Sequence, residues 1–306
     1  MTVTQDPRKE ELARKINEAA AINFKNQAWL DEVAQEITDG VYQGFRSNNF
    51  QAVMTETVSL SLDGRYKFEE ARGLKAFWHA RGGYIEESDM WKDTYEILPD
   101  TIGFRFRQSH DRLRTNFAET AATLVSLGGQ RMTAEINKRV LQTFQAAAGV
   151  GDPSYVGVSG LSLANVNAAL AAVRDASENS RPVIVGRSTM TEKLVDLLTV
   201  GNTYPLFTPQ SNEQLLNSGQ IGTYRGAQVI TLPNYVDAYG NNAMAANELY
   251  VIDPSAGRTI YFGGTESINS NDADDWYWNY VLRQDINVIV AYADRFRRIV
   301  DSTVPA

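Results

Sequence analysis

Apolar residues near the N-terminus recur at a helical spacing. Residues 7–24 place them four positions apart, and residues 27–46 repeat the pattern, so each segment would gather them on one face of a helix. The two segments are therefore predicted to form amphipathic helices. Their apolar stripes are narrow and fit two interpretations equally well: the helices cover the main domain, or they pack on a neighbouring subunit.

The pattern then changes to the alternation of a strand. Apolar and polar residues alternate over residues 55–62, and Asp63-Gly64 ends the run with a turn signal. Strand-like sequence returns within residues 95–107. We predict that residues 55–107 form a long hairpin that carries a loop rich in aromatic residues and glycine. A hairpin of that reach has little core of its own and needs a partner.

A long helical pattern follows the predicted hairpin. Apolar residues recur every three or four positions over residues 113–149, which would make a helix of roughly 50 Å at 1.5 Å per residue. Gly128-Gly129 lies at its centre, where a bend or a close backbone contact is expected. A helix this long in a chain of 306 residues is predicted to be the spine of the molecule.

The segment 149–160, rich in glycine and serine, reads as a linker, and a different texture follows it. A helix capped by Ser162 and a second helix starting at Thr189 flank a short buried strand. Further strands are predicted, so this part reads as an α/β subdomain with a mixed sheet. These strands cover residues 182–185, 229–232, 248–252 and 259–262.

The last forty residues alternate apolar and polar positions strongly. Trp276, Trp278 and Tyr280 lie on one face of a predicted strand, and a second alternating run covers residues 286–290. We expect these terminal strands to return to the first subdomain. The aromatic face needs a large partner such as the spine helix.

The composition is typical of a folded protein and includes no cysteine. Hydrophobic residues make up 43% and charged residues 22% of its 306 residues, a length at which two subdomains are expected. The absence of cysteine excludes disulfides, thiolate metal sites and a cysteine nucleophile. The first twenty residues carry many charges and no unbroken apolar stretch, so no secretory signal and no membrane segment are expected.

The net charge of −8 argues against a reader of nucleic-acid sequence, which needs a clustered positive field. One local group is basic and comprises Arg105, Arg107, Arg112 and Arg114. We interpret it as a solvated helix start or as a source of salt bridges between subunits.

Few residues offer chemistry. The chain has two histidines, and His79 is best interpreted as a surface or interface residue, whereas His110 with Asp111 resembles a helix cap.

Acidic residues and glycines give no better site. Asp272, Asp274 and Asp275 have the spacing of a calcium loop but lack the glycine and distal glutamate that complete one. Glycines at 219, 222 and 226 do not form a nucleotide loop, because a strand follows them and no helix opens after them. No catalytic, cofactor-binding or metal-binding residue is assigned, and a carboxylate-pair hydrolase stays open without support.

The same glycines carry a different resemblance. Gly219, Gly222 and Gly226 form a Gly-x-x-Gly-x-x-x-Gly pattern, followed by the apolar stretch 229–232 and Pro233. This segment resembles the second domain of the major capsid proteins of tailed double-stranded DNA bacteriophages, the Hong Kong 97-type fold. The order of the predicted elements resembles that family over nearly the whole chain.

The resemblance implies an α+β fold with an N-terminal arm, an extended hairpin loop, a long spine helix and an axial α/β domain. The divisions that it implies are a helical arm at 1–49, an extended loop at 50–109, a peripheral domain with the spine helix at 110–157 and 265–306, and an axial domain at 158–264. The implied function is a non-enzymatic major capsid protein. It would self-assemble into the hexamers and pentamers of an icosahedral shell that encloses the viral DNA.

The resemblance also implies partners. Copies of the chain, a separate scaffolding protein, a portal, possible decoration proteins and non-specific contacts with packaged DNA are expected, without cofactors or a membrane, in a virion assembled in the host cytoplasm. Some relatives join subunits by a Lys–Asn isopeptide bond, and Lys67 and Lys75 lie in the predicted loop, but no acceptor is identifiable and we expect no such bond. The alternatives are an encapsulin-type nanocompartment shell and a carboxylate-dependent hydrolase.

Overall fold

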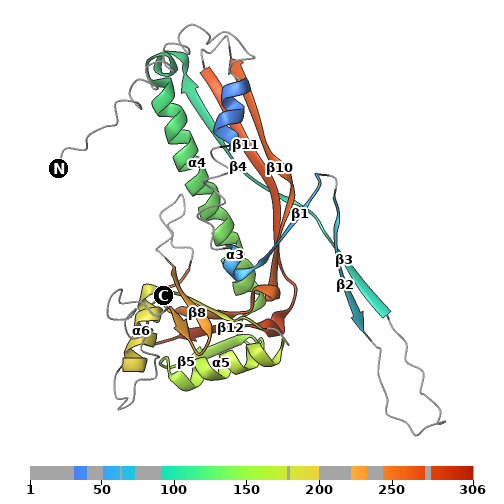
Figure 1. Cartoon of the computed structure of the whole chain (residues 1–306), viewed down its shortest axis with the longest axis vertical. Coiled ribbons are helices and arrows are strands. Elements are labelled where there is room, and N and C mark those ends of the chain that lie inside the picture. Colours follow the sequence, from blue (N-terminus) through green and yellow to red (C-terminus); the bar gives the residue numbers. More distant parts are fainter. Residues whose placement is uncertain are drawn as a thin grey trace.

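The computed structural model describes most of the chain, and the molecule is elongated (Figure 1). A tall part is built on one long helix and a sheet of long strands, and a shorter part with its own sheet lies at one end. The predicted helix at 7–24 lies outside the described residues. These are 31–39, 51–62, 64–72, 91–177, 180–199, 222–232, 244–272 and 277–305.

The tall part contains a four-stranded sheet with the order β1-β10-β11-β4. Strands β10 and β11 pair antiparallel along most of their length, with a register shift between Phe262 and Glu266. Strand β1 runs parallel to β10, and β4 runs antiparallel to β11 at the other edge. The strands are β1 (Glu56–Leu60), β4 (Asp100–Ser109), β10 (Gly257–Asp272) and β11 (Tyr277–Val290).

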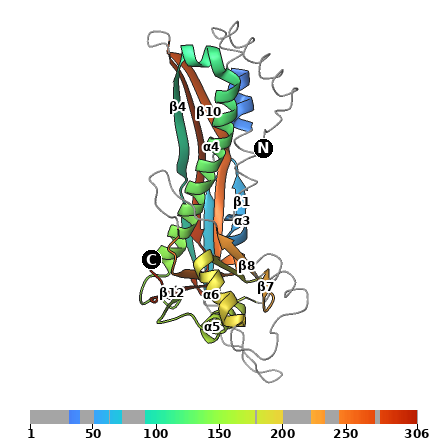
Figure 2. The same cartoon turned by 90° about the vertical axis from the view of Figure 1, so that its left-hand side faces the viewer.

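Helix α4 (His110–Ala147) confirms the predicted spine and lies along one face of this sheet (Figure 2). Its 38 residues span about 57 Å at 1.5 Å per residue. The aromatic face of β11 packs against it as expected: the ring of Trp278, which is 1% exposed, lies 6.2 Å from that of Phe117. At the other end Phe144 meets Phe296 edge-on at 5.0 Å.

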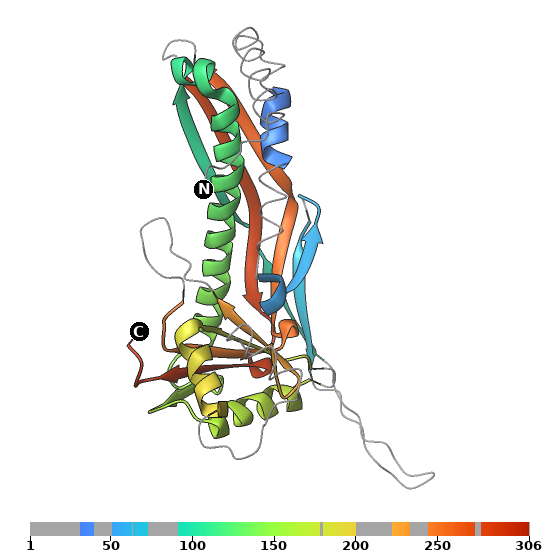
Figure 3. The same ribbon diagram turned by 60° about the vertical axis from the view of Figure 1, so that its left-hand side comes forward.

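The described part of the second predicted arm helix, residues 31–39, is helical and lies beside α4 on the same sheet (Figure 3). Ala34 and Ile37 are buried there. The hydroxyls of Thr38 and Tyr280 are 2.8 Å apart. This segment therefore covers the main domain of its own chain, which is the first of the two interpretations of the sequence. A short helix, α3 (Gln51–Met54), leads from the arm into β1.

The shorter part is a six-stranded mixed sheet with the order β5-β12-β9-β6-β8-β7. Helices α5 (Leu163–Asp175) and α6 (Ser188–Thr199) pack on one face, and the last turns of α4 pack on the other. The strands are β5 (Tyr155–Val158), β6 (Val183–Arg187), β7 (Thr223–Tyr224), β8 (Ala227–Leu232), β9 (Glu248–Ile252) and β12 (Phe296–Asp301).

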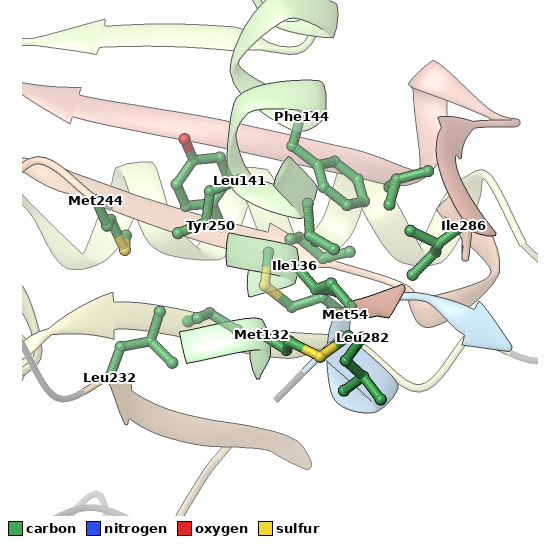
Figure 4. Packing of buried hydrophobic residues seen from close by; sticks show 14 of the residues in the cluster. Met54, Met132, Ile136, Leu141, Phe144, Leu232, Met244, Tyr250, Leu282 and Ile286 are labelled. Atoms are coloured by element: carbon green, nitrogen blue, oxygen red, sulfur yellow. The ribbon is translucent and has the colours of Figure 1, made fainter. Parts of the chain in front are cut away.

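Alternate residues of β9 serve two cores. Tyr250 points to the end of α4 (Figure 4), and both Tyr250 and Ile252 belong to the main core. Leu249 and Val251 point to α5 and α6. A strand buried on both faces reads as a continuous apolar run, which is why the sequence pattern located it. The helix that Ser162 caps is also confirmed, since the Ser162 hydroxyl accepts a hydrogen bond from the backbone N–H of Asn165 at 3.3 Å.

Strand pairing differs from the sequence expectations in two ways. Residues 55–107 do not pair as one hairpin: β1 and β4 lie at opposite edges of the four-stranded sheet, and only β2 (Tyr66–Arg72) and β3 (Trp91–Ile97) pair with each other. The run at 259–262 belongs to β10 in the tall part, whereas β12 belongs to the six-stranded sheet. Alternation identifies a strand but carries no information about its partner, and this is the reason for both errors.

Two short 3-10 helices join the sheets. η1 (Pro254–Ala256) connects β9 to β10, and η2 (Ala293–Arg295) connects β11 to β12. The backbone N–H of Asp253 donates to the carbonyl of Arg295 at 3.0 Å, so the two connections are bonded to each other. Gly257 is required here, because a Cβ atom on it would lie 2.8 Å from the ring of Phe144.

Candidate assembly surfaces

The β2–β3 hairpin projects away from both sheets (Figure 1). Its pairs run from Tyr66 opposite Ile97 to Arg72 opposite Trp91, and within the described residues it forms a sheet of its own. An isolated two-stranded hairpin is marginally stable in water. Its geometry therefore fits a segment that gains its packing from another molecule.

Apolar side chains are exposed on and next to this hairpin. Tyr95 is 54% exposed and Leu98 is 69% exposed. The ion pair between Arg65 and Glu96, at 3.2 Å, is also open to solvent and adds little stability by itself. Exposed apolar side chains on a projecting hairpin fit a surface that contacts another protein.

Arg258 holds the base of the hairpin. Its guanidinium donates a hydrogen bond to the hydroxyl of Tyr66 and lies 5.9 Å from the ring centroid of Phe68. Its Nε atom is 3.7 Å from a carboxylate oxygen of Glu56 on β1. The Phe68 ring also meets Tyr292 edge-on at 5.9 Å. These contacts tie β2 to β10 and to the segment after β11.

A groove of about 670 Å³ runs between α4 and β4, the edge strand of the tall sheet. Leu127 on its rim is 52% exposed, and the ion pair of Arg139 with Asp100, at 2.8 Å, lines a second hollow of about 410 Å³ farther along the same edge. Edge strands present unpaired backbone groups to solvent. The first groove is lined by Phe104, Arg105, Phe106, Gln108, Glu119, Thr120, Thr123, Leu124, Leu127, Gly128 and Arg131.

A buried polar cluster joins α4 to the six-stranded sheet. The carboxylate of Glu248 accepts hydrogen bonds from Arg298 at 2.5 Å, from the Tyr250 hydroxyl at 2.7 Å and from Gln145 at 3.0 Å. Arg298 also donates to the carbonyl of Ala148, at the end of α4, at 3.0 Å. Burial, with the nearby Glu248 carboxylate as a second cause, raises the pKa of Tyr250 well above its usual range. The cluster fixes the direction of the spine relative to this sheet.

Asp301 closes the other end of β12. Its buried carboxylate accepts hydrogen bonds from the Lys193 ammonium at 3.0 Å and from the backbone N–H of Leu161 at 3.0 Å. Burial alone would raise its pKa, but these bonds and those from Thr303 outweigh it and lower the pKa to about 2. The charge therefore anchors the C-terminal segment to α6.

The residues that the sequence singled out do not form a site in the described part of the chain. His110 is the first residue of α4, and the N-cap position belongs to Ser109, which corrects the expected cap. Asp272 ends β10. His79, Asp274, Asp275, Gly219 and Lys75 lie outside the described residues, and Lys67 is an exposed residue of β2. No group of three or more potential metal ligands occurs within the ranges described.

Gly226 lies in the turn between β7 and β8. Arg225 and Gly226 both have positive φ, 49° and 79°, and connect β7 to β8 as a two-residue hairpin turn. Gly222 lies just before β7. These glycines therefore shape a sheet edge, and the strand predicted after them is confirmed as β8.

Two arginines of the basic group lie on β4, not at a helix start as the sequence suggested. Arg105 donates to the Asn279 side chain at 3.3 Å, and the Arg107 guanidinium lies 4.2 Å from the ring centroid of Tyr277. Both are exposed on the sheet face that α4 does not cover. Arg112 and Arg114 belong to the first two turns of α4, so this half of the group does lie at a helix start.

Among the described helices none is both long and apolar enough to cross a membrane.

Comparison with known families identifies the class of protein that carries these surfaces. Residues 10–299 match the model of the family described as SPbeta prophage-derived putative capsid protein YonB. The chain belongs to this capsid protein family. No curated protein matches it.

Solved structures share the fold of this capsid protein. The mature capsid of bacteriophage PhiM1 is 10% identical with a TM-score of 0.59, covering 84% of this chain and 88% of that one. Mycobacterium phage Bobi is 12% identical with a TM-score of 0.62, covering 83% and 90%. A virus-like particle from Pyrococcus furiosus is 9% identical with a TM-score of 0.54, covering 87% and 98%. The expected Hong Kong 97-type α+β fold is confirmed.

Sequence reasoning missed Arg258 and the groove beside β4. The alternate spacing of Tyr66 and Phe68 indicates that their side chains share one face of a strand, but it does not indicate what packs against that face. The contribution of Arg258, far away in the sequence, has no local pattern that could have revealed it.

Proposed function

We propose that this capsid protein is the major shell subunit of a tailed bacteriophage or prophage. It self-assembles into hexamers and pentamers of an icosahedral shell around double-stranded DNA, and it has no enzymatic activity. The observation that carries the proposal is the projecting β2–β3 hairpin in a chain of a capsid family. A hairpin without a core of its own gains packing when it lies over a neighbouring subunit.

The remaining surfaces support the same assignment. The groove between α4 and β4 and the exposed Tyr95 and Leu98 would lose solvent contact in a closed assembly. The compact six-stranded part would lie at the symmetry axes, with the tall part between them. We keep the divisions predicted from sequence, with an axial domain at 158–264. Most of β5 and all of β12 belong to the six-stranded sheet but lie outside these limits, and the first part of β10 belongs to the tall sheet but lies inside them.

Further partners belong to the proposal. A separate scaffolding protein would guide assembly, a portal would replace one vertex, and decoration proteins would bind the outside. Packaged DNA would be contacted without sequence preference, since the chain carries a net charge of −8 and its one local basic group, within residues 105–114, is small. Assembly would take place in the host cytoplasm, and the protein would reside in the virion.

Expression of the chain alone and with its neighbouring genes tests the proposal by negative-stain microscopy and light scattering. Hollow icosahedral particles or capsomer-sized rings are expected. A well-folded protein that stays strictly monomeric under all these conditions would overturn it. Recovery of DNA from particles made with the full gene set separates a phage capsid from other shells.

A second candidate is an encapsulin-type compartment that holds protein cargo. The likeness to the virus-like particle from Pyrococcus furiosus, over 98% of that chain, favours it, although the matched family is one of capsid proteins. Particles that form without a portal gene and contain a defined protein in place of DNA would assign the chain to this class.

A further inference from the structure

The direction of the β2–β3 hairpin is not set by strand pairing. In the described residues its two strands pair only with each other. It is attached through a connection between Leu60 and Tyr66 and a shorter one between Ile97 and Asp100. Two chain connections do not by themselves define the angle of the hairpin. Side-chain contacts at the base must therefore fix its angle to the four-stranded sheet.

Among the described residues, Arg258 makes most of the side-chain contacts between the base of the hairpin and the sheet. It lies near the start of β10, and its half-buried side chain reaches the same face of β2 at two successive inward positions, Tyr66 and Phe68. The two ring centroids lie 6.0 Å and 5.9 Å from its guanidinium carbon. The hydrogen bond to the Tyr66 hydroxyl gives this contact a direction as well as an attraction.

The carboxylate of Glu56 holds the guanidinium from the other side. It lies 3.7 Å from Nε, a buried nitrogen that makes no hydrogen bond. Since Glu56 is paired with Arg258 in the β1–β10 register, the ion pair joins neighbouring strands of the rigid sheet. The guanidinium therefore contacts Glu56 on the sheet and Tyr66 on the hairpin at the same time.

Two lesser contacts complete the base. The Phe68 ring packs edge-on against Tyr292, and the side chain of Asn287 donates to the Leu98 carbonyl at 2.6 Å, just after β3. The first contact shares Phe68 with Arg258. The second holds the exit of the hairpin, but one hydrogen bond permits rotation about itself.

We propose that Arg258 is the positioning residue that sets the angle between the β2–β3 hairpin and the four-stranded sheet, by clamping Tyr66 and Phe68 against Glu56. The hairpin then moves with the sheet as one rigid arm. A small rotation at this base becomes a large displacement at the far end. If the hairpin contacts a neighbouring subunit, Arg258 also selects the angle between subunits, a consequence that rests on the proposed function.

Distance measurements between two spin labels test the clamp on the full chain. The chain contains no cysteine, so Thr94→Cys on β3 and Ser270→Cys on β10 give two unique attachment sites, both exposed. Double electron–electron resonance is measured with labelled chain diluted in unlabelled chain, which suppresses distances between subunits. We expect a single narrow distance distribution in the parent and a broadened one, without the parent peak, in Arg258→Met.

Arg283→Met is the matched control. Arg283 is also an arginine of the tall sheet paired with a glutamate, Glu266, but it lies on β11 and makes no contact with the described part of the hairpin. Its distribution should equal that of the parent. A merely structural loss would affect both variants, so the difference between them isolates the clamp.

Two milder variants keep the proposal testable if Arg258→Met does not fold, which circular dichroism and thermal unfolding will show. Tyr66→Phe removes only the hydroxyl, and Phe68→Leu removes the ring that Arg258 and Tyr292 share. Both should broaden the distribution less than Arg258→Met. Parent-like distributions in every folded variant would overturn the clamp.

The shell measurement separates this proposal from the proposed function. If the parent forms particles, Arg258→Met should give particles of mixed size or open sheets in electron micrographs, and Arg283→Met should give parental ones. If the parent forms no particles, the proposed function fails while the label distances still decide the clamp. Uniform parental particles from a variant with a broadened distance distribution would overturn the link between hairpin angle and shell geometry.

Discussion

The two sheets of this capsid protein solve the problem of burial differently. The six-stranded sheet has helices α5 and α6 on one face and the end of α4 on the other, so its central strand β9 is fully buried within one subunit. The four-stranded sheet has α4 and the helix at 31–39 on one face, whereas polar and charged side chains such as Arg105 and Arg107 occupy the other. The first sheet is complete within the subunit. The second leaves an edge, an open face and a projecting hairpin for other molecules.

This difference predicts where substitutions act. Changes inside the cores should reduce the stability of the subunit, whereas changes on the hairpin should leave the subunit intact and affect association. The following variants test that division, beginning with the largest expected effect.

Trp278→Ala should have the largest effect, because this 1% exposed side chain fills the space between β4, β11 and α4. Removing a buried large aromatic side chain costs about 3–5 kcal/mol. Chemical denaturation followed by fluorescence or circular dichroism measures the loss. Tyr277→Ala, at the neighbouring exposed position, is the control and should cost less than about 1 kcal/mol. Equal losses in both would mean that the tall part lacks a specific core.

Arg298→Met should come next, because it leaves the Glu248 carboxylate buried at the joint without its cationic partner. Removing one partner of a buried ion pair costs about 3–5 kcal/mol, and we expect the lower end of this range because the Arg298 side chain is 17% exposed. The double variant Glu248→Leu with Arg298→Met removes both charges and should recover part of this loss. A double variant as unstable as Arg298→Met would show that packing, and not charge, holds the joint.

Acid should remove the contribution of Asp301. Its pKa is about 2 in the folded chain and lies near 3.9 in an unfolded one, so its stabilisation is present above pH 4 and is lost as the pH falls toward 2. The shift corresponds to about 2.6 kcal/mol. Asp301→Asn should flatten the dependence of unfolding free energy on pH in this window. Asp294→Asn, at an exposed residue of η2, should leave the pH dependence as in the parent.

Tyr95→Ser should have the smallest effect on the subunit, within about 0.5 kcal/mol, because the side chain is 54% exposed. Assembly followed by light scattering should nevertheless be slower or incomplete. Tyr95→Phe keeps the apolar ring and should assemble like the parent. Normal assembly of Tyr95→Ser would remove this face of the hairpin from the contact between subunits.

Local sequence pattern predicted the elements better than their pairing. The stripe over 113–149 identified α4, and the cap at Ser162 located α5, because helical periodicity and capping depend on neighbours in sequence. The parallel pairing of β1 with β10 joins residues about two hundred positions apart, and nothing in either strand specifies it. The contact of Arg258 with Tyr66 could not be predicted for the same reason, because the two residues are 192 positions apart in the sequence.

Family resemblance contributed what pattern could not. The glycines at 222 and 226 are ordinary turn residues in the structure, yet their place before β8 suggested the capsid fold. The histidines and the acidic triplet gave no site because their functional interpretations required neighbours that the sequence does not supply.

The long β10–β11 pair has a mechanical consequence. Both strands continue through η1 and η2 into the six-stranded sheet, so a pull between the two ends of the subunit runs along the strands and not across them. Under such a pull, both strands are loaded in the same direction along their covalent backbones, whereas a pull across the strands would open the hydrogen bonds between them one after another. In a shell wall that holds the long axis of the subunit in its plane, pressure from the contents would load each subunit in its stiffest direction.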